Sequence, residues 1–302
     1  MSHDLFPRTL TSRDVTLSLH PVDTGAVVMG ILNVTPDSFS DGGQYLNLES
    51  AVERASNMIA EGATIIDVGG ASSRPRGSAY GDGAAVVSPE EESTRVKPVI
   101  TEISHRFPNV MISIDTWSAR VAADAIHAGA HIINDITGLR GDPDMASIAG
   151  ESGVPVVLMH SVGLPGDMPQ QASYGNVTTD VCWALQKSVR VAQAAGCTQI
   201  VLDPGIGFGK TTADNMKLIR DTSQLVALGW PVLIGASRKT SIGRVLGSET
   251  EPVPVEKRLA GSLAAAGHAV TQGARIVRTH DIQETVDFLK VQSAITSNGN
   301  RS

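Results

Sequence analysis

The chain has few cysteines and few aromatic residues. Its 302 residues include only Cys182 and Cys197, too few for a disulfide framework, so we interpret both as reduced thiols of a cytoplasmic protein. Aromatic residues make up 4% of the chain, whereas hydrophobic residues make up 41%. The core is therefore expected to be aliphatic, which is typical of parallel strands buried on both faces.

Long apolar runs and blocks of positive charge are also missing. No stretch of 18 apolar residues occurs, and the first ten residues hold no apolar signal core, so we expect neither a membrane span nor a secretory signal. The net charge is −7 and no Lys- or Arg-rich block is present, which argues against nucleic acid and anionic membranes as partners. Any bound anion therefore needs a local cluster of cations.

Short aliphatic runs alternate with longer amphipathic ones along the whole chain. Eight short runs are predicted strands, at Val27–Asn33, Thr64–Gly69, Val110–Asp115, His131–Ile136, Val154–His160, Gln199–Asp203, Pro231–Ala236 and Arg275–Arg278. The predicted helices are Ser50–Glu61, Pro89–Arg106, Ser118–Ala128, Pro143–Ser152, Asn176–Ala195, Thr212–Leu228, Val255–Gln272 and Ile282–Ala294. Eight such units predict an α/β fold, a single-domain (β/α)8 TIM barrel, which typically needs about 250 residues.

Local motifs support the helix boundaries. Ser88 followed by Pro89 and Glu91 indicates a capping box. Glycines expected to adopt a left-handed conformation stand just after six helices, at Gly62, Gly129, Gly153, Gly196, Gly229 and Gly273. We divide the chain into an N-terminal extension (1–26) with a hairpin at the amino end of the barrel, the barrel itself (27–295), and a disordered polar tail (296–302).

Polar residues stand at the end of every predicted strand or just after it. They include Asn33, Asp67, Asp115, Asn134, His160, Asp203, Lys239 and Arg278. Because the carboxyl ends of all eight strands point to one face of a barrel, we expect these groups to form one site. As alternatives, Asp115, Asn134 and Asp203 would be helix N-caps. Likewise Arg74, Lys239, Arg278 and His280 would be surface ion-pair partners, and His160 a core histidine.

Three other kinds of chemistry are excluded. No residues have the spacing of a zinc clamp, and no serine–histidine–acid triad is suggested. The segment Gly205–Thr211 looks like a phosphate-binding P-loop, but Pro204 stands where the first glycine of that motif is required. We interpret this segment, which carries Phe208, as a loop that lets a flat ring approach the backbone.

The motifs at the strand ends resemble, in chain order, the signatures of the dihydropteroate synthases of folate biosynthesis. They are Gly30–Gly43, Asp67–Gly70 with Ser73–Pro75, Ile114–Thr116, Ile133–Ile136, Leu202–Lys210, Ser237–Lys239 and Arg278–Asp281. The resemblance runs from Val27 to the last helix. It implies a transferase that joins 6-hydroxymethyl-7,8-dihydropterin diphosphate to 4-aminobenzoate and releases pyrophosphate, by loose, SN1-like cleavage of the C–O bond.

The resemblance also implies roles for individual residues. The pterin is expected to contact Asp115, Asn134, Ile136, Met159, Asp203, Phe208 and Lys239. The diphosphate is expected to contact Asn33, Arg74, Arg278 and His280, with Asn33 also binding Mg²⁺, the expected cofactor. The aminobenzoate is expected to contact Phe39, Ser73, Pro75, Phe208 and Thr240. The expected catalytic residues are Asp41, Asp115, Arg74 and Lys239, and a homodimer through the outer helices is implied.

The chain departs from the family pattern around the aminobenzoate side. Ala71 replaces a usual glutamate, Ser73 a usual threonine and Thr240 a common serine, Ser161 follows the Met-His pair, and residues 76–84 extend the second loop. We hypothesise that this loop alters discrimination between 4-aminobenzoate and sulfonamide mimics. Inhibition constants that stay unchanged when residues 76–84 are trimmed would argue against it.

Two other functions remain open at this stage. One is a catalytically silent pterin-binding paralogue, which Ala71 and the extended loop keep in consideration although Asp41, Arg74 and Lys239 argue against it. The other is a pterin-dependent methyltransferase that serves a corrinoid protein. A methyltransferase has no use for a diphosphate site, so Arg278 and His280 argue against it.

Overall fold

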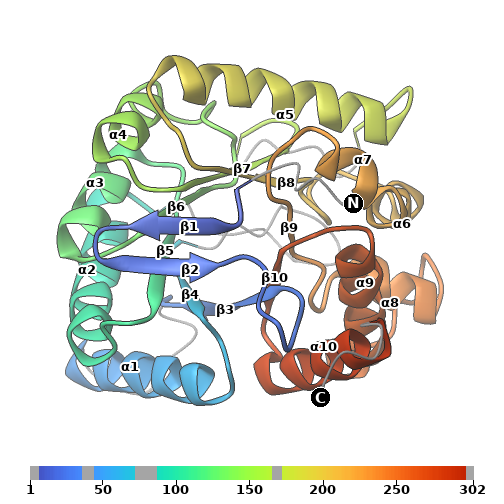
Figure 1. Ribbon diagram of the computed structural model, residues 1–302, viewed down its shortest axis with the longest axis horizontal. Coiled ribbons are helices and arrows are strands. Elements are labelled where there is room, and N and C mark those ends of the chain that lie inside the picture. The colour runs from blue at the N-terminus through green and yellow to red at the C-terminus, as the bar shows by residue number, and fades with distance from the viewer. Residues whose placement is uncertain (1–6, 36–43, 72–86, 165–171, 297–302) are drawn as a thin grey trace.

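The computed structural model describes residues 7–35, 44–71, 87–164 and 172–296. Eight parallel strands form a central sheet that helices surround (Figure 1). The strands are β3 Val27–Asn33, β4 Ile65–Gly69, β5 Met111–Asp115, β6 Ile132–Asp135, β7 Val156–Met159, β8 Ile200–Asp203, β9 Leu233–Ile234 and β10 Ile276–Thr279. All eight predicted strands are thus present, and β3 has the predicted bounds.

The sheet closes into a barrel. The strand order is β8-β7-β6-β5-β4-β3-β10-β9, and a parallel bridge between Leu202 and Val232 connects the two outermost strands. The N–H of Leu202 donates to the carbonyl of Pro231 at 2.8 Å at the same place. The predicted barrel is therefore confirmed. Strand β9 is shorter than predicted, because Pro231 has no N–H to give to a ladder and the sheet pairing at Val232 is a single bridge.

The predicted hairpin covers the amino end of the barrel. Strands β1 (Thr9–Ser12) and β2 (Val15–Ser18) pair antiparallel and lie across the barrel strands in Figure 1. Leu10 and Leu19 are 2% and 0% exposed and pack against one aliphatic residue or more from each of the eight strands. The side chain of Gln199 accepts from the N–H of Thr11 and donates to its carbonyl, at 2.8 and 2.7 Å.

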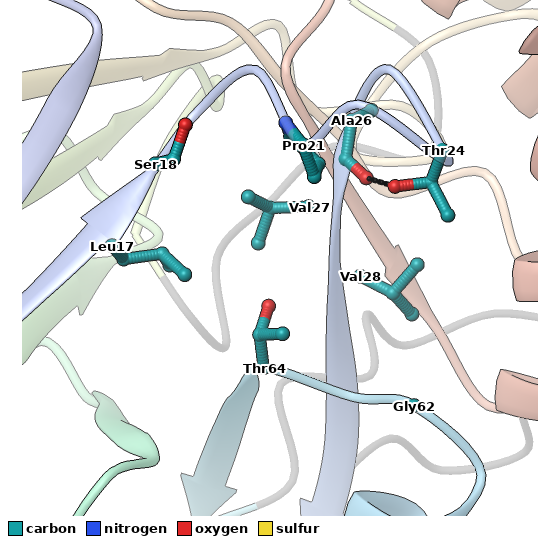
Figure 2. A pocket seen from close by; sticks show the side chains of 9 residues that line it. All are labelled: Leu17, Ser18, Pro21, Thr24, Ala26, Val27, Val28, Gly62 and Thr64. Carbon is teal, nitrogen blue, oxygen red and sulfur yellow. Dashed lines mark hydrogen bonds between the residues drawn. The ribbon is translucent and has the colours of Figure 1, made fainter. Parts of the chain in front are cut away.

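A small pocket remains between the hairpin and the barrel (Figure 2). It lies where β3 and β4 begin, and Thr24 closes one side by donating to the carbonyl of Ala26 at 2.8 Å. Its lining residues are Leu17, Ser18, Pro21, Thr24, Ala26, Val27, Val28, Gly62 and Thr64. None of these residues is charged, so this pocket is not suited to a phosphate.

Side-chain alternation separates an apolar layer from a polar one inside the barrel. In each strand the inward-facing residue of the amino half is aliphatic, and the residue two positions later faces inward too. Five such pairs carry a polar group at the second position: Ile65 with Asp67, Met111 with Ser113, Ile132 with Asn134, Val201 with Asp203, and Ile276 with Arg278. The carboxyl half of the barrel interior is therefore polar.

The helices mostly follow the predicted pattern. They are α1 Gln44–Ala60, α2 Pro89–Arg106, α3 Ala119–Ala128, α4 Met145–Ser152, α5 Val177–Ala194, α6 Thr212–Arg220, α7 Thr222–Val226, α8 Thr240–Leu246, α9 Leu259–Thr271 and α10 Ile282–Thr296, with a 3-10 turn, η2, at Val255–Lys257. None of the helices in the described ranges is both long enough and apolar enough to cross a bilayer.

Three helix predictions are wrong in detail. The single helix predicted at 212–228 is two helices, because the chain leaves helical geometry at Asp221, whose carboxylate accepts from Thr178 and Lys217. The helix predicted from Val255 begins as η2 and continues as α9. Helix α1 begins six residues earlier than predicted, and Thr296, assigned to the tail, ends α10. The rest of the predicted tail lies outside the described residues.

The predicted helix ends are largely confirmed. Each of the six glycines assigned to helix C-termini has a positive φ, between 67° and 121°. Ser88 caps α2 and accepts from the N–H of Glu91 at 3.2 Å. A capping box with both hydrogen bonds formed occurs at a place the sequence analysis did not identify, between Thr211 and Asp214 at the start of α6.

Candidate active site

An arginine lies between two carboxylates at the carboxyl ends of neighbouring strands. Arg278 of β10 donates through Nε to Asp67 of β4 at 2.6 Å and through Nη2 to Asp115 of β5 at 2.8 Å. The side chain of Asn134 donates to the same oxygen of Asp67 at 3.1 Å. Asp67 is 0% exposed. The cluster therefore joins residues up to 211 positions apart in the sequence, as barrel closure requires.

The helix-cap interpretation is wrong for Asp115, Asn134 and Asp203, and the surface ion-pair interpretation is wrong for Arg278. The N-cap positions of the helices that follow Asp115, Asn134 and Asp203 are Ser118, Asp144 and Thr211 instead, and the side chains of Ser118 and Thr211 accept the capping hydrogen bonds. Arg278 is no surface residue either, since its side chain is 20% exposed and faces the barrel interior. Polar groups from different strands thus meet at one end of the barrel, as the sequence predicted.

Burial sets the protonation of this cluster. Removal from water raises the pKa of Asp115 to about 7, although the Arg278 guanidinium opposes the shift. Burial also raises the pKa of Asp203, against the hydrogen bond from the N–H of Gly205. Burial by itself would lower the pKa of Arg278, but the Asp67 and Asp115 carboxylates outweigh it and raise that pKa. The carboxylates thus keep Arg278 charged, whereas burial makes Asp115 and Asp203 easier to protonate.

A flat aromatic ring and a lysine form the adjoining wall. The Lys239 ammonium lies 4.2 Å from the centroid of the Phe208 ring, within reach of a cation–π contact. Burial, together with the nearby Arg278 charge, lowers the pKa of Lys239 to about 8. Ile136 and Met159 form an apolar cluster that Phe208 contacts. All four residues were predicted to contact the pterin, and the structure brings them together.

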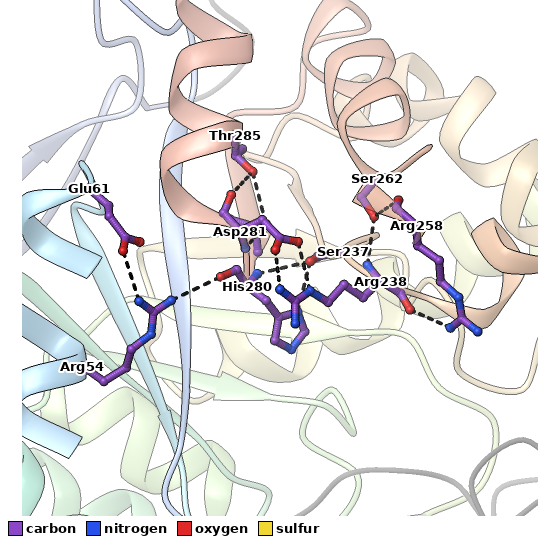
Figure 3. A network of polar contacts seen from close by, with 10 residues as sticks. Arg54, Glu61, Ser237, Arg238, Arg258, Ser262, His280, Asp281 and Thr285 are labelled. Carbon is purple, nitrogen blue, oxygen red and sulfur yellow. Dashed lines mark hydrogen bonds and ion pairs between the residues drawn. The ribbon is translucent and has the colours of Figure 1, made fainter. Parts of the chain in front are cut away.

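The loops after β9 and β10 are bound to each other (Figure 3). Ser237 and the Nδ1 atom of His280 are 3.0 Å apart. The Arg238 guanidinium binds the Asp281 carboxylate with both Nε and Nη2. Arg238 has a φ of 58°, a left-handed conformation uncommon for a side-chain-bearing residue. The neighbouring Lys239 is thereby held next to the barrel interior.

Both strand-end histidines are neutral at pH 7. Burial, with the Arg278 charge beside it, lowers the pKa of His280 to about 4, so His280 is a neutral hydrogen-bonding group and not an ion-pair partner. Burial lowers the pKa of His160 to about 3. The Nδ1 atom of His160 is buried and has no hydrogen-bond partner among the residues that the structure describes. His160 is therefore a buried core histidine, which was the alternative interpretation given for it from the sequence.

Two acidic residues of the site were not assigned a role from the sequence. Asp67 was noted at its strand end, and its place two positions after the aliphatic Ile65 was the signal that it faces inward. Glu92, on α2, is 4% exposed, and burial raises its pKa to about 7. It is close enough to Asp115 for their charges to interact. No motif in the sequence indicated Glu92.

The remaining predicted residues divide into two groups. Asn33 ends β3 and is exposed at the mouth, and Thr240 is the buried first residue of α8. Arg74, Asp41, Phe39, Ser73 and Pro75 lie outside the described residues, as does the extension at 76–84.

A magnesium ion would find oxygen ligands at the mouth. Asn33 Oδ1 and Asp115 Oδ2 each lie 3.8 Å from the position that a Cβ atom on Gly69 would take. Mg²⁺ prefers oxygen ligands and commonly uses one or two from the protein, with water and substrate phosphates supplying the others. In the described ranges no three His, Cys, Asp or Glu side chains form a metal clamp. The residues fit an ion shared with a phosphate.

The sequence and the fold have close counterparts. The family of pterin binding enzymes matches residues 29–280. The dihydropteroate synthase of Bacillus subtilis is 45% identical over 275 residues, 90% of each chain. A Xanthomonas albilineans dihydropteroate synthase solved with 4-aminobenzoic acid has a TM-score of 0.85 and 41% identity, covering 96% of this chain and 99% of that one.

The same Xanthomonas albilineans enzyme in complex with 7,8-dihydropteroate has a TM-score of 0.81 and 39% identity, covering 96% of this chain and 99% of that one. The closed barrel, with its polar layer at the carboxyl ends of the strands, is consistent with the similarity to these two structures. The chain belongs to the pterin binding enzymes and, within them, to the dihydropteroate synthases, which are transferases.

Proposed function

We propose that the chain condenses 6-hydroxymethyl-7,8-dihydropterin diphosphate with 4-aminobenzoate, and that it does so by ionising the C–O bond to the diphosphate. The observation that carries this proposal is Arg278 held between Asp67 and Asp115 at the mouth of a closed barrel. A 4-aminobenzoate amine is neutral and weak, so the enzyme has to stabilise a loose transition state. Acids close to the reacting carbon and cations close to the departing anion supply that stabilisation.

The described side chains match the edges of a pterin ring. Asp115 and Asp203 accept hydrogen bonds from its ring N–H and amino groups, while Asn134 and Lys239 donate to its carbonyl and ring nitrogen. Ile136 and Met159 provide apolar surface for the ring face. A ring without the matching polar atoms leaves buried groups unpaired, at a cost of about 1–3 kcal/mol each.

The departing pyrophosphate needs donors and positive charge. Arg278 supplies a permanent charge, and His280 supplies a neutral imidazole, since burial lowers its pKa to about 4. We assign Mg²⁺ binding to Asn33, and the ion would neutralise charge on the phosphates. Arg74, assigned to the same task, lies outside the described residues.

As the diphosphate leaves, positive charge grows on the methylene carbon of the pterin. We assign its stabilisation to the Asp115 carboxylate, with Asp41 of the first loop, outside the described residues, in the same role. The apolar wall of Phe208 and Met159 limits water beside that carbon. The aminobenzoate then attacks from the side of Phe208 and Thr240, where residues 39 and 73–75 are also expected.

Turnover in the presence of both substrates and Mg²⁺ tests the proposal. The purified protein should release pyrophosphate and form 7,8-dihydropteroate in equal amounts. The Arg278→Ala variant should lose far more affinity for the pterin diphosphate than for a bare pterin. Arg120→Ala, at an exposed pair on α3, is the control and should behave as wild type. Equal losses for the two ligands would remove Arg278 from the diphosphate site, and binding without turnover would indicate a silent paralogue.

We also propose that the protein is a cytoplasmic homodimer. Exposed apolar side chains on two outer helices support the dimer: Val245 and Leu246 on α8 are 58% and 49% exposed, and Val291 and Ile295 on α10 are 61% and 78% exposed. Sedimentation equilibrium tests it, and a single species with the monomer mass of 31.6 kDa at high protein concentration would contradict it.

A further inference from the structure

Lys210, the lysine of the segment that looks like a P-loop, is buried. All of its described hydrogen bonds go to backbone carbonyls. Lys210 is 5% exposed. Its ammonium donates to the carbonyls of Gly205 at 2.9 Å, Phe208 at 3.1 Å and His160 at 3.3 Å. An ammonium group has three N–H donors and no acceptor, so three carbonyls use all of them.

Those carbonyls belong to the end of β7 and to the turn that follows β8. Gly205, Gly207 and Gly209 have φ values of 69°, 83° and 63°, so every second residue of the turn is left-handed. A Cβ atom on Gly205 would lie 1.9 Å from the carbonyl oxygen of His160, which means that only glycine permits this approach. Three carbonyl dipoles aimed at one point repel each other, and the ammonium offsets that repulsion.

The other side of the same turn faces the pterin site. Phe208 lies beneath the Lys239 ammonium. The N–H of Gly205 donates to Asp203 Oδ1 at 2.7 Å. A Cβ atom on Gly207 would come within 2.9 Å of the Lys239 side chain. The shape of the turn therefore sets the positions of Asp203, Phe208 and Lys239 together, and no hydrogen bond from Lys210 reaches those three side chains.

We infer that Lys210 is a positioning residue for pterin binding: its ammonium fixes the turn at 205–209 so that Asp203, Phe208 and Lys239 match the pterin ring. The inference rests on the proposed function for the identity of the ligand. Lys210 itself does not touch the substrate in this account. Its effect is on affinity for the pterin, and affinity for 4-aminobenzoate changes less.

Substitution by methionine, which keeps the apolar stem and removes the ammonium, is the first test. Lys210→Met should bind a bare pterin roughly 10- to 100-fold more weakly than wild type, as expected when site groups shift by about 1 Å. The KM for the pterin diphosphate should rise more than the KM for 4-aminobenzoate. Lys187→Met, on the exposed face of α5 where the ammonium lies over Trp183, is the matched control. Unchanged pterin affinity in Lys210→Met would overturn the inference.

A second variant serves if the methionine variant does not fold. Lys210→Ala leaves a cavity next to the three carbonyls, and propylammonium chloride should restore pterin binding to it. 1-Propanol has a similar volume but one donor, so equal restoration by the alcohol, or none by propylammonium, would overturn the inference. Binding of the bare pterin is measured by its fluorescence, independently of turnover. If the wild-type protein binds pterin but makes no dihydropteroate, the proposed reaction is refuted. The effect of Lys210 on pterin binding can still be tested in that case.

Discussion

The buried pair between Asp67 and Arg278 offers the sharpest test of the site. Asp67→Asn keeps the shape of the side chain and the oxygen that accepts from Arg278 and Asn134, but it removes the charge. It also puts an amide group at the position of Oδ1, which is buried and has no hydrogen-bond partner within the described part of the chain. Breaking a buried pair costs about 3–5 kcal/mol. Because Arg278 keeps Asp115 at 2.8 Å, we expect the lower end, about 3 kcal/mol.

Thermal unfolding measures the effect. For a domain of this size about 3 kcal/mol corresponds to a fall of roughly 5 °C in Tm. Glu61→Gln is the control, because Glu61 pairs with Arg54 at 3.2 Å with both side chains about a third exposed, and such a pair contributes about 0–1 kcal/mol. If Asp67→Asn lowered Tm no more than Glu61→Gln, the charge of Asp67 would not stabilise the barrel, and our account of the cluster would be refuted.

Two further predictions concern pH and the amino end of the barrel. A plot of kcat/KM against pH, from about pH 6 to about pH 9, should be a narrow bell. Activity should fall below about pH 7 because Asp115 becomes protonated, and above about pH 8 because Lys239 loses its proton. An acid limb that persists in Asp115→Asn would assign that limb to another group. Leu10→Ala should lower the free energy of unfolding by about 2–5 kcal/mol in urea and leave pterin affinity unchanged, because Leu10 packs at the end opposite the site. A loss of pterin affinity together with the loss of stability would contradict our placing of the pterin site at the opposite end of the barrel from Leu10.

Much of the fold was predictable because it depends on local patterns. The aliphatic runs located all eight strands, and glycines located six helix ends, since both signals act within a few residues. The helix boundary at Asp221 was missed because its cause is a hydrogen bond from Thr178, 43 positions away. Glu92 was missed for a similar reason: its burial beside Asp115 comes from the packing of α2 on the barrel.

For the site, the sequence by itself determined which polar residues stand at the strand ends and, through alternation with period two, which of them face inward. It could not determine which inward groups meet. That depended on closure of the barrel at Leu202 and Val232, which brings Arg278 of the last strand to Asp67 and Asp115. Likewise the motif around Lys210 was visible, but only the folded turn aims three carbonyls at its ammonium. Hydrogen bonds and charge interactions act over a few ångströms in space, and separation along the chain says little about that distance.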